Sequence, residues 1–113
     1  MLTLKGNPKS TQQCYRFTAR GGYMVNECTY LKMCYQKDAR QQWRQNILED
    51  DLEVTVKLYF GDKRKRDIDN FNKLWMDALE GVVYQNDAQI KRLLISKNYD
   101  KENPRIEVTI KSV

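Results

Sequence analysis

The chain has 113 residues, a formal net charge of +5 and few glycines or prolines, which suits one folded domain with a modest core. It contains no histidine, so His-ligated zinc and Ser-His or Cys-His nucleophile pairs are excluded, and catalysis must rest on carboxylates, lysines, tyrosines or a metal ion. No run of 18 apolar residues and no basic-then-apolar start occurs, so we expect a cytoplasmic protein without a membrane partner.

The first quarter of the chain predicts short β-structure. Residues 2–5 are expected to form a strand, followed by a polar loop over residues 7–10. Residues 16–18 and 23–25 flank Gly21-Gly22, a pattern that predicts a hairpin turning at the two glycines.

A helix is predicted from Asn26, the expected N-cap, to about Leu48. Apolar residues recur there every four positions, as on one face of an amphipathic helix. These residues are Leu31, Tyr35, Ala39, Trp43 and Ile47. The opposite face is basic, and it is either a solvated surface or a phosphate-binding one. Its basic residues are Lys32, Lys37, Arg40 and Arg44.

The second half of the chain alternates strands with one helix. Residues 52–60 alternate apolar and polar side chains with period two, the clearest strand pattern in the sequence. Residues 71–79 have helical spacing that stops at Gly81, the expected C′ residue, and residues 90–96 and 105–110 predict two closing strands. We therefore expect a single domain over residues 1–113 of the α/β (α+β) class, with a mixed β-sheet and two main helices on one side.

Three cysteines, Cys14, Cys28 and Cys34, are odd in number and lack CxxC spacing. A disulfide framework and a zinc knuckle are therefore not expected, and the sequence predicts free thiols in a reducing compartment.

An acidic pair, Asp67 and Asp69, is separated by Ile68. In an extended segment this spacing points both carboxylates to one side while Ile68 faces the core, which suits a hard cation such as Mg²⁺. Asp87, which precedes a predicted strand, is the best third carboxylate. The alternatives are that Asp69 is a helix N-cap and that Asp67 is a turn residue.

Lys73 lies four residues after Asp69 and four before Asp77, so these side chains share a face if a helix begins near Asn70. Its ammonium is a candidate to bind a phosphate and stabilise charge in a transition state. The alternative is an ordinary helix salt bridge with an aspartate.

Basic residues are unevenly distributed. Residues 1–48 carry eight Lys or Arg against two acids, and residues 63–66 form the run Lys-Arg-Lys-Arg just before the acidic pair. Such a run is either a solvated loop or part of a surface for a polyanion.

The string over residues 66–90 has the pattern D-x-D-N-x-x-K-x-x-x-D-A-L followed by D-x-Q-I. It resembles the core signature of the RusA family of Holliday junction resolvases. The resemblance implies a Mg²⁺-dependent endodeoxyribonuclease of DNA recombination and repair that acts as a homodimer and nicks four-way junctions symmetrically. The motif implies Asp67, Asp69 and Asp87 as metal ligands, with Lys73 as a catalytic residue beside the phosphate.

The resemblance also implies that basic residues grip the junction arms, mostly through phosphates. The candidates are Lys9, Arg16, Arg20, Lys63, Arg64, Lys65, Arg66 and Lys73. Family members often carry an acidic residue where this chain has Asn86. Two other functions stay open, namely a non-catalytic branched-DNA-binding protein and a nuclease of a different class.

Overall fold

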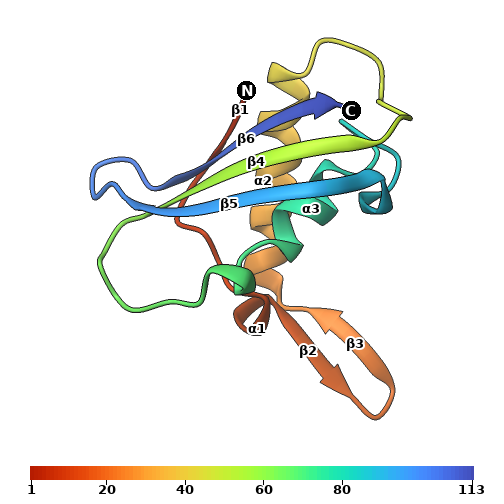
Figure 1. Ribbon diagram of the computed structural model, residues 1–113. Helices are drawn as coiled ribbons and strands as arrows, with labels where there is room; N and C mark the ends of the chain where they lie inside the picture. Colours follow the sequence, from red (N-terminus) through yellow and green to blue (C-terminus); the bar gives the residue numbers. More distant parts are fainter.

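A four-stranded mixed sheet forms the frame of the molecule in the computed structural model, which describes residues 1–113 (Figure 1). The strands lie in the order β1 (Leu2–Lys5), β6 (Arg105–Ser112), β4 (Leu52–Phe60) and β5 (Ile90–Tyr99). β6 is antiparallel to both of its neighbours, whereas β5 is parallel to β4. A parallel pair requires a crossover connection, and the chain makes it through the helix α3 (Lys73–Leu79).

One face of the sheet is covered by helices, and this explains the period-two pattern of β4. Its apolar side chains, from Leu52 to Phe60, are buried, while the alternate residues face the open side and are half-buried or exposed. Figure 1 shows α2 (Asn26–Gln42) and α3 together on one side of the sheet. The predicted strand and the α+β class with a mixed sheet are confirmed.

The short helix α3 is held by its buried face. Leu74, Trp75, Ala78 and Leu79 are buried, and the Trp75 indole N–H donates to Asn72 Oδ1 at 3.1 Å, so the buried indole is not left unpaired. The helix ends as predicted, because Gly81 has φ +82°, the left-handed conformation that favours glycine after a helix.

Helix α2 is shorter than the predicted helix, which was expected to reach Leu48. It ends at Gln42, and Val25 stands at the N-cap position without a side-chain hydrogen bond, so the expected Asn26 cap is wrong. The chain leaves the helix because Leu48 pairs with the segment after α3, where its N–H donates to Val83 O. None of the helices combines the length and the apolar character that crossing a bilayer requires.

A small hairpin follows the one-turn helix α1 (Thr11–Cys14), which the sequence prediction missed. Ser10 caps α1 in a capping box with Gln13. The hairpin strands are β2 (Tyr15–Thr18) and β3 (Gly21–Met24). Gly21 and Gly22 pair with Thr18 and Phe17, so the glycines belong to the second strand and the predicted turn position is wrong.

Cys14 and Cys28 form a disulfide, so the prediction of three free thiols is wrong for these two residues. Both are buried, and Cys34 is the free cysteine. Their sequence separation of 14 holds no spacing signature, because they meet only when the hairpin folds back and returns the chain to the start of α2. The disulfide therefore ties the base of the hairpin to α2.

Candidate active site

The loop that follows β4 carries the basic run and is organised by Asp62. Arg64 donates its backbone N–H to Asp62 Oδ1 at 3.0 Å, and the Arg66 guanidinium contacts the same oxygen at 2.8 Å. These contacts lower the pKa of the Asp62 carboxyl below its ordinary value, the Arg64 amide contributing most. Arg66 also lies over the Phe60 ring, 4.3 Å from its centroid. The basic run is therefore an ordered loop.

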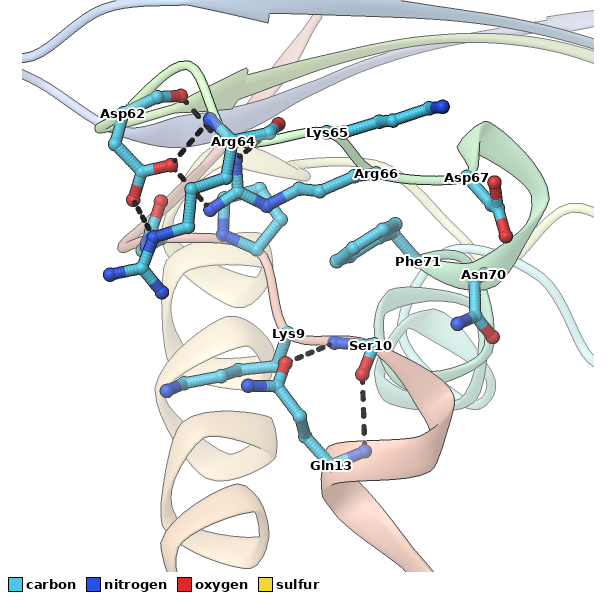
Figure 2. Close-up of a pocket in the computed structure, with 12 residues that line it drawn as sticks. Lys9, Ser10, Gln13, Asp62, Arg64, Lys65, Arg66, Asp67, Asn70 and Phe71 are labelled. Atoms are coloured by element: carbon cyan, nitrogen blue, oxygen red, sulfur yellow. Dashed lines mark hydrogen bonds and ion pairs between the residues drawn. The ribbon is translucent and has the colours of Figure 1, made fainter.

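A polar cavity of about 580 Å³ opens between this loop and the N-terminal segment, and we call it the basic cleft. Figure 2 shows the stretch from Asp62 to Asp67 on one side and the stretch from Lys9 to Gln13 on the other. The lining residues are Asn7, Pro8, Lys9, Ser10, Gln13, Asp62, Arg64, Lys65, Arg66, Asp67, Asn70 and Phe71. Four cations, from segments more than 50 residues apart, thus surround one polar hollow beside Asp67.

Asp67 and Asp69 do not lie in an extended segment. Residues Ile68–Asn70 form a 3₁₀ turn, η1, and Ile68 is 38% exposed, so it does not face the core as predicted. The alternative role of Asp69 as a helix N-cap is also wrong, since Asn72 holds that position at α3. Both carboxylates are exposed on the turn that leads from the basic cleft into α3.

Asp87 lies beside two acidic residues that the sequence prediction did not include among the metal ligands. Carboxylate oxygens of Asp77, Glu80 and Asp87, the acidic trio, lie within 4.8 Å of one another, and each side chain is half-buried. Asp77 and Glu80 are three residues apart around α3, and Asp87 returns to them because Glu80 Oε1 accepts the Asp87 backbone N–H at 3.0 Å. The sequence signals for this group are the i, i+3 spacing of Asp77 and Glu80 and the places of Asp77 and Asp87 in the family motif.

Around Asp87, the acidic trio has a chemistry that fits a magnesium ion. It offers carboxylate oxygens only, the hard donors that Mg²⁺ prefers. Buried Tyr84 lies close by, and its pKa is raised, chiefly by burial and further by the charges of Glu80, Asp87 and Asp77. The negative potential of the three carboxylates is thus concentrated at one place.

Lys73 forms the helix salt bridge that was one of its two predicted roles. Its Nζ lies 3.4 Å from Asp77 Oδ2 and 5.1 Å from the centroid of the Tyr15 ring. Tyr15 from the hairpin donates its hydroxyl to the same Asp77 oxygen at 2.7 Å. A cation and a phenol therefore contact one member of the acidic trio, and Tyr15 is a site residue that no sequence motif marked.

Asn86, where family members often carry an acid, has a local structural role. Its side chain accepts a hydrogen bond from the Ala88 N–H at 2.8 Å and forms a capping box with Gln89 at the 3₁₀ turn η2 (Asp87–Gln89). Asn86 thus fixes the turn that carries Asp87.

The remaining predicted DNA-binding residues are spread over two surfaces. Lys63 adjoins the basic cleft and lies over the Tyr99 ring, 5.0 Å from its centroid. Arg16 and Arg20 are exposed on the hairpin and do not line the cleft. Lys9 faces the cleft but is also paired with Glu27 at 3.5 Å.

Two comparisons with known proteins bear on this site. The family described as "Endodeoxyribonuclease RusA" matches residues 5–111, nearly the whole chain. The uncharacterized protein YqaN of Bacillus subtilis (strain 168) is 45% identical over 49 residues. That match covers 43% of this chain and 34% of YqaN, so it spans about a third of that relative's length. On the match over residues 5–111, the chain belongs to the RusA family of endodeoxyribonucleases.

Proposed function

We propose that this chain is a Mg²⁺-dependent endodeoxyribonuclease that resolves four-way (Holliday) DNA junctions as a homodimer. The observation that carries the proposal is the basic cleft, which brings Lys9, Arg64 and Arg66 together beside Asp67 in a chain of the RusA family. Cations around a polar hollow suit a phosphate, and a carboxylate at its edge suits the metal ion that phosphodiester hydrolysis uses.

The DNA backbone is the part of the substrate that the basic cleft fits best. Lysine and arginine contacts to phosphates position DNA without reading its sequence, and they weaken as salt rises. Lys65 makes no ion pair within the chain, and Arg64 makes only a long one at 3.9 Å, so both are available for phosphates. Binding is therefore expected to be strongly salt-dependent and largely independent of sequence.

The proposed metal ligands are Asp67, Asp69 and Asp87. The family motif supports this assignment; Asp67 and Asp69 are exposed, and Asp87 lies in the acidic trio, to which the other two do not belong. When bound, Mg²⁺ would supply a more acidic water and neutralise charge on the scissile phosphate. Glu80 orients the Asp87 backbone through its hydrogen bond, and Asp77 directs the ammonium of Lys73 toward the same region.

Lys73 is proposed as the cation that stabilises charge developing on the phosphate. Its side chain is about half exposed, so its ammonium is accessible to a ligand while Asp77 limits its freedom. A homodimer suits the substrate because a four-way junction has approximate two-fold symmetry, and two copies of one site then cut opposite strands.

The test compares a mobile four-way junction with a linear duplex of equal length, each incubated with purified protein and Mg²⁺. Paired, symmetric nicks in the junction, and none in the duplex, are expected. Junction binding without cleavage would support the non-catalytic DNA-binding alternative, and equal cutting of both substrates would overturn junction specificity. Light scattering at micromolar concentration tests the dimer, which paired cutting by a monomer would contradict.

A further inference from the structure

We propose that the β2–β3 hairpin is a DNA-contacting arm on which the exposed ring of Phe17 stacks against a nucleobase at the branch point of a junction. This inference rests on the proposed function, since it places the branch point of the same DNA junction on the hairpin, outside the basic cleft. The hairpin projects from the body of the molecule beside α1, away from the sheet (Figure 1).

The base of the hairpin is fixed by three contacts. The Val25 N–H donates to Cys14 O at 2.9 Å, and the disulfide joins Cys14 to Cys28 of α2. Tyr15, the first residue of β2, donates its hydroxyl to Asp77 of the acidic trio. The arm therefore starts at the candidate active site, and its base holds a defined position relative to the acidic carboxylates.

The outer part of the hairpin does not pack against the hydrophobic core. None of the residues in its two strands is buried, and Phe17 is 80% exposed. Gly22 stands opposite Phe17, and a Cβ at that glycine would lie only 3.1 Å from the Phe17 ring. The absence of a side chain at Gly22 thus lets the ring lie across the hairpin, with most of its surface available to a flat partner.

The two faces of the hairpin differ. Successive side chains of a strand point to opposite faces, so Phe17 shares a face with Tyr15, one strand repeat of about 6.8 Å further out. Tyr23 pairs with Arg16 and lies on the other face, where it is 56% exposed. Phe17, not Tyr23, is therefore the exposed aromatic on the face that begins at the acidic trio.

The charge of the hairpin favours a nucleic acid over a second copy of the chain as the occupant. Residues 15–25 contain Arg16 and Arg20 and no acidic residue. Arg20 makes no ion pair, and the chain as a whole carries a net charge of +5, so hairpins of two copies repel one another. The exposed Phe17 ring offers a flat surface on which an unpaired base can stack, and the positive charge of the hairpin attracts the DNA backbone.

The experiment measures binding without metal, so that cleavage does not interfere. Affinities of the unchanged chain, Phe17→Ala and Phe17→Trp are compared on a four-way junction and on a linear duplex, in EDTA. Phe17→Ala is expected to lower junction affinity about tenfold, with duplex affinity unchanged, and Phe17→Trp is expected to keep it, because any aromatic face stacks. Tyr23→Ala, the control on the opposite face, is expected to bind like the unchanged chain.

A photocrosslink identifies the contact directly. A junction carrying 5-iododeoxyuridine at the branch point is irradiated in the complex, and the adduct is expected on the peptide that contains Phe17. Crosslinking elsewhere, or equal junction affinity for Phe17→Ala and the unchanged chain, overturns the inference. A loss of dimerisation in Phe17→Ala overturns it in favour of a second copy as the occupant.

The outcomes separate this inference from the proposed function. If the unchanged chain neither binds nor cuts a junction, both fail together. If the unchanged chain cuts the junction and Phe17→Ala binds it equally well, only the role of Phe17 fails.

Discussion

The hydroxyl of Tyr15 donates a hydrogen bond to Asp77 Oδ2 at 2.7 Å, which joins two residues that are 62 positions apart. Lys73 Nζ contacts the same oxygen at 3.4 Å. The pKa of the Tyr15 hydroxyl is raised above its ordinary value of 10.0, first by burial and then by this hydrogen bond to a carboxylate. The hairpin and α3 are therefore coupled through one carboxylate oxygen.

This coupling predicts the titration of Tyr15. Replacing Asp77 by Asn is expected to lower the Tyr15 pKa, because the charge and the strongest acceptor are both removed, while burial keeps it above 10.0. Carbon-13 NMR of labelled tyrosines between pH 8 and 12, assigned with Tyr15→Phe, measures it. An unchanged Tyr15 titration in Asp77→Asn contradicts the coupling.

Mg²⁺ binding is expected to depend on the proposed ligands more than on their neighbours. Asp69→Asn and Asp87→Asn are expected to abolish junction cleavage and lower Mg²⁺ affinity by about tenfold or more, while junction binding in EDTA persists. Titration calorimetry with Mg²⁺ alone measures the affinity. Undiminished cleavage by Asp69→Asn would refute its role as a ligand, and a larger loss in Asp77→Asn than in Asp69→Asn would move the ion to the acidic trio.

Lys73→Ala is expected to slow junction cutting by about 100-fold or more and to change junction affinity little, since its ammonium is proposed to act on charge that develops in the reaction. Single-turnover cleavage and binding in EDTA, measured on the same junction, separate the two effects. Because Lys73 also pairs with Asp77, Lys73→Arg serves as the control that keeps a cation beside Asp77. An equal loss of cutting and binding would make Lys73 a docking residue.

The substitution Tyr35→Phe is expected to leave the protein as stable or to make it more stable. The Tyr35 side chain is fully buried in α2, and its hydroxyl is the one buried side-chain polar atom with no hydrogen-bond partner. Tyr35→Phe removes an unpaired polar group without creating a large cavity, so the free energy of unfolding is expected to stay equal or to rise by about 1 kcal/mol. Urea unfolding at pH 7 measures it, and a loss above about 1 kcal/mol would reveal a partner for the hydroxyl.

Stability is expected to fall at alkaline pH because of Tyr84, whose buried hydroxyl donates to Met76 O at 2.7 Å. Its pKa is raised above 10.0 in the folded chain, mainly by burial, so above pH 10 the unfolded chain binds fewer protons than the folded one. The stabilisation is thus complete below pH 10 and decreases as pH rises toward the folded pKa, by at most about 1.4 kcal/mol per pH unit. Urea unfolding at pH 8 to 11 measures it, with Tyr84→Phe expected to show a smaller slope.

Local sequence patterns predicted the features that depend on neighbouring residues, such as strand alternation and the end of a helix. The alternation of residues 52–60 gave β4 its correct bounds because one face of that strand is buried, and Gly81 ended α3 because its left-handed φ favours glycine. The membership in the RusA family was predicted from polar motif positions and is confirmed. The capping box of Ser10 and Gln13 was a readable signal for α1 that the prediction overlooked.

The features that the sequence did not predict depend on contacts between residues that are far apart in the chain. Asp77 and Glu80 reach Asp87 because the chain folds back after α3, where the Gly81 N–H donates to Tyr84 O at 2.8 Å. Cys14 meets Cys28 only when the intervening hairpin closes. The segment with Asp67 and Asp69, expected to be extended, contains a 3₁₀ turn instead. Helix α3 begins three residues after this 3₁₀ turn, and the first residues of the helix must pack on the core.

The disulfide between Cys14 and Cys28 turns the hairpin into a covalent ring. All of β2 and β3 lies inside that ring, including the exposed tip around Arg20. A single break in the backbone between the two cysteines would therefore leave the two pieces of the chain linked until the sulfurs are reduced. The most exposed segment of the molecule is thus the one whose scission does not by itself divide the protein.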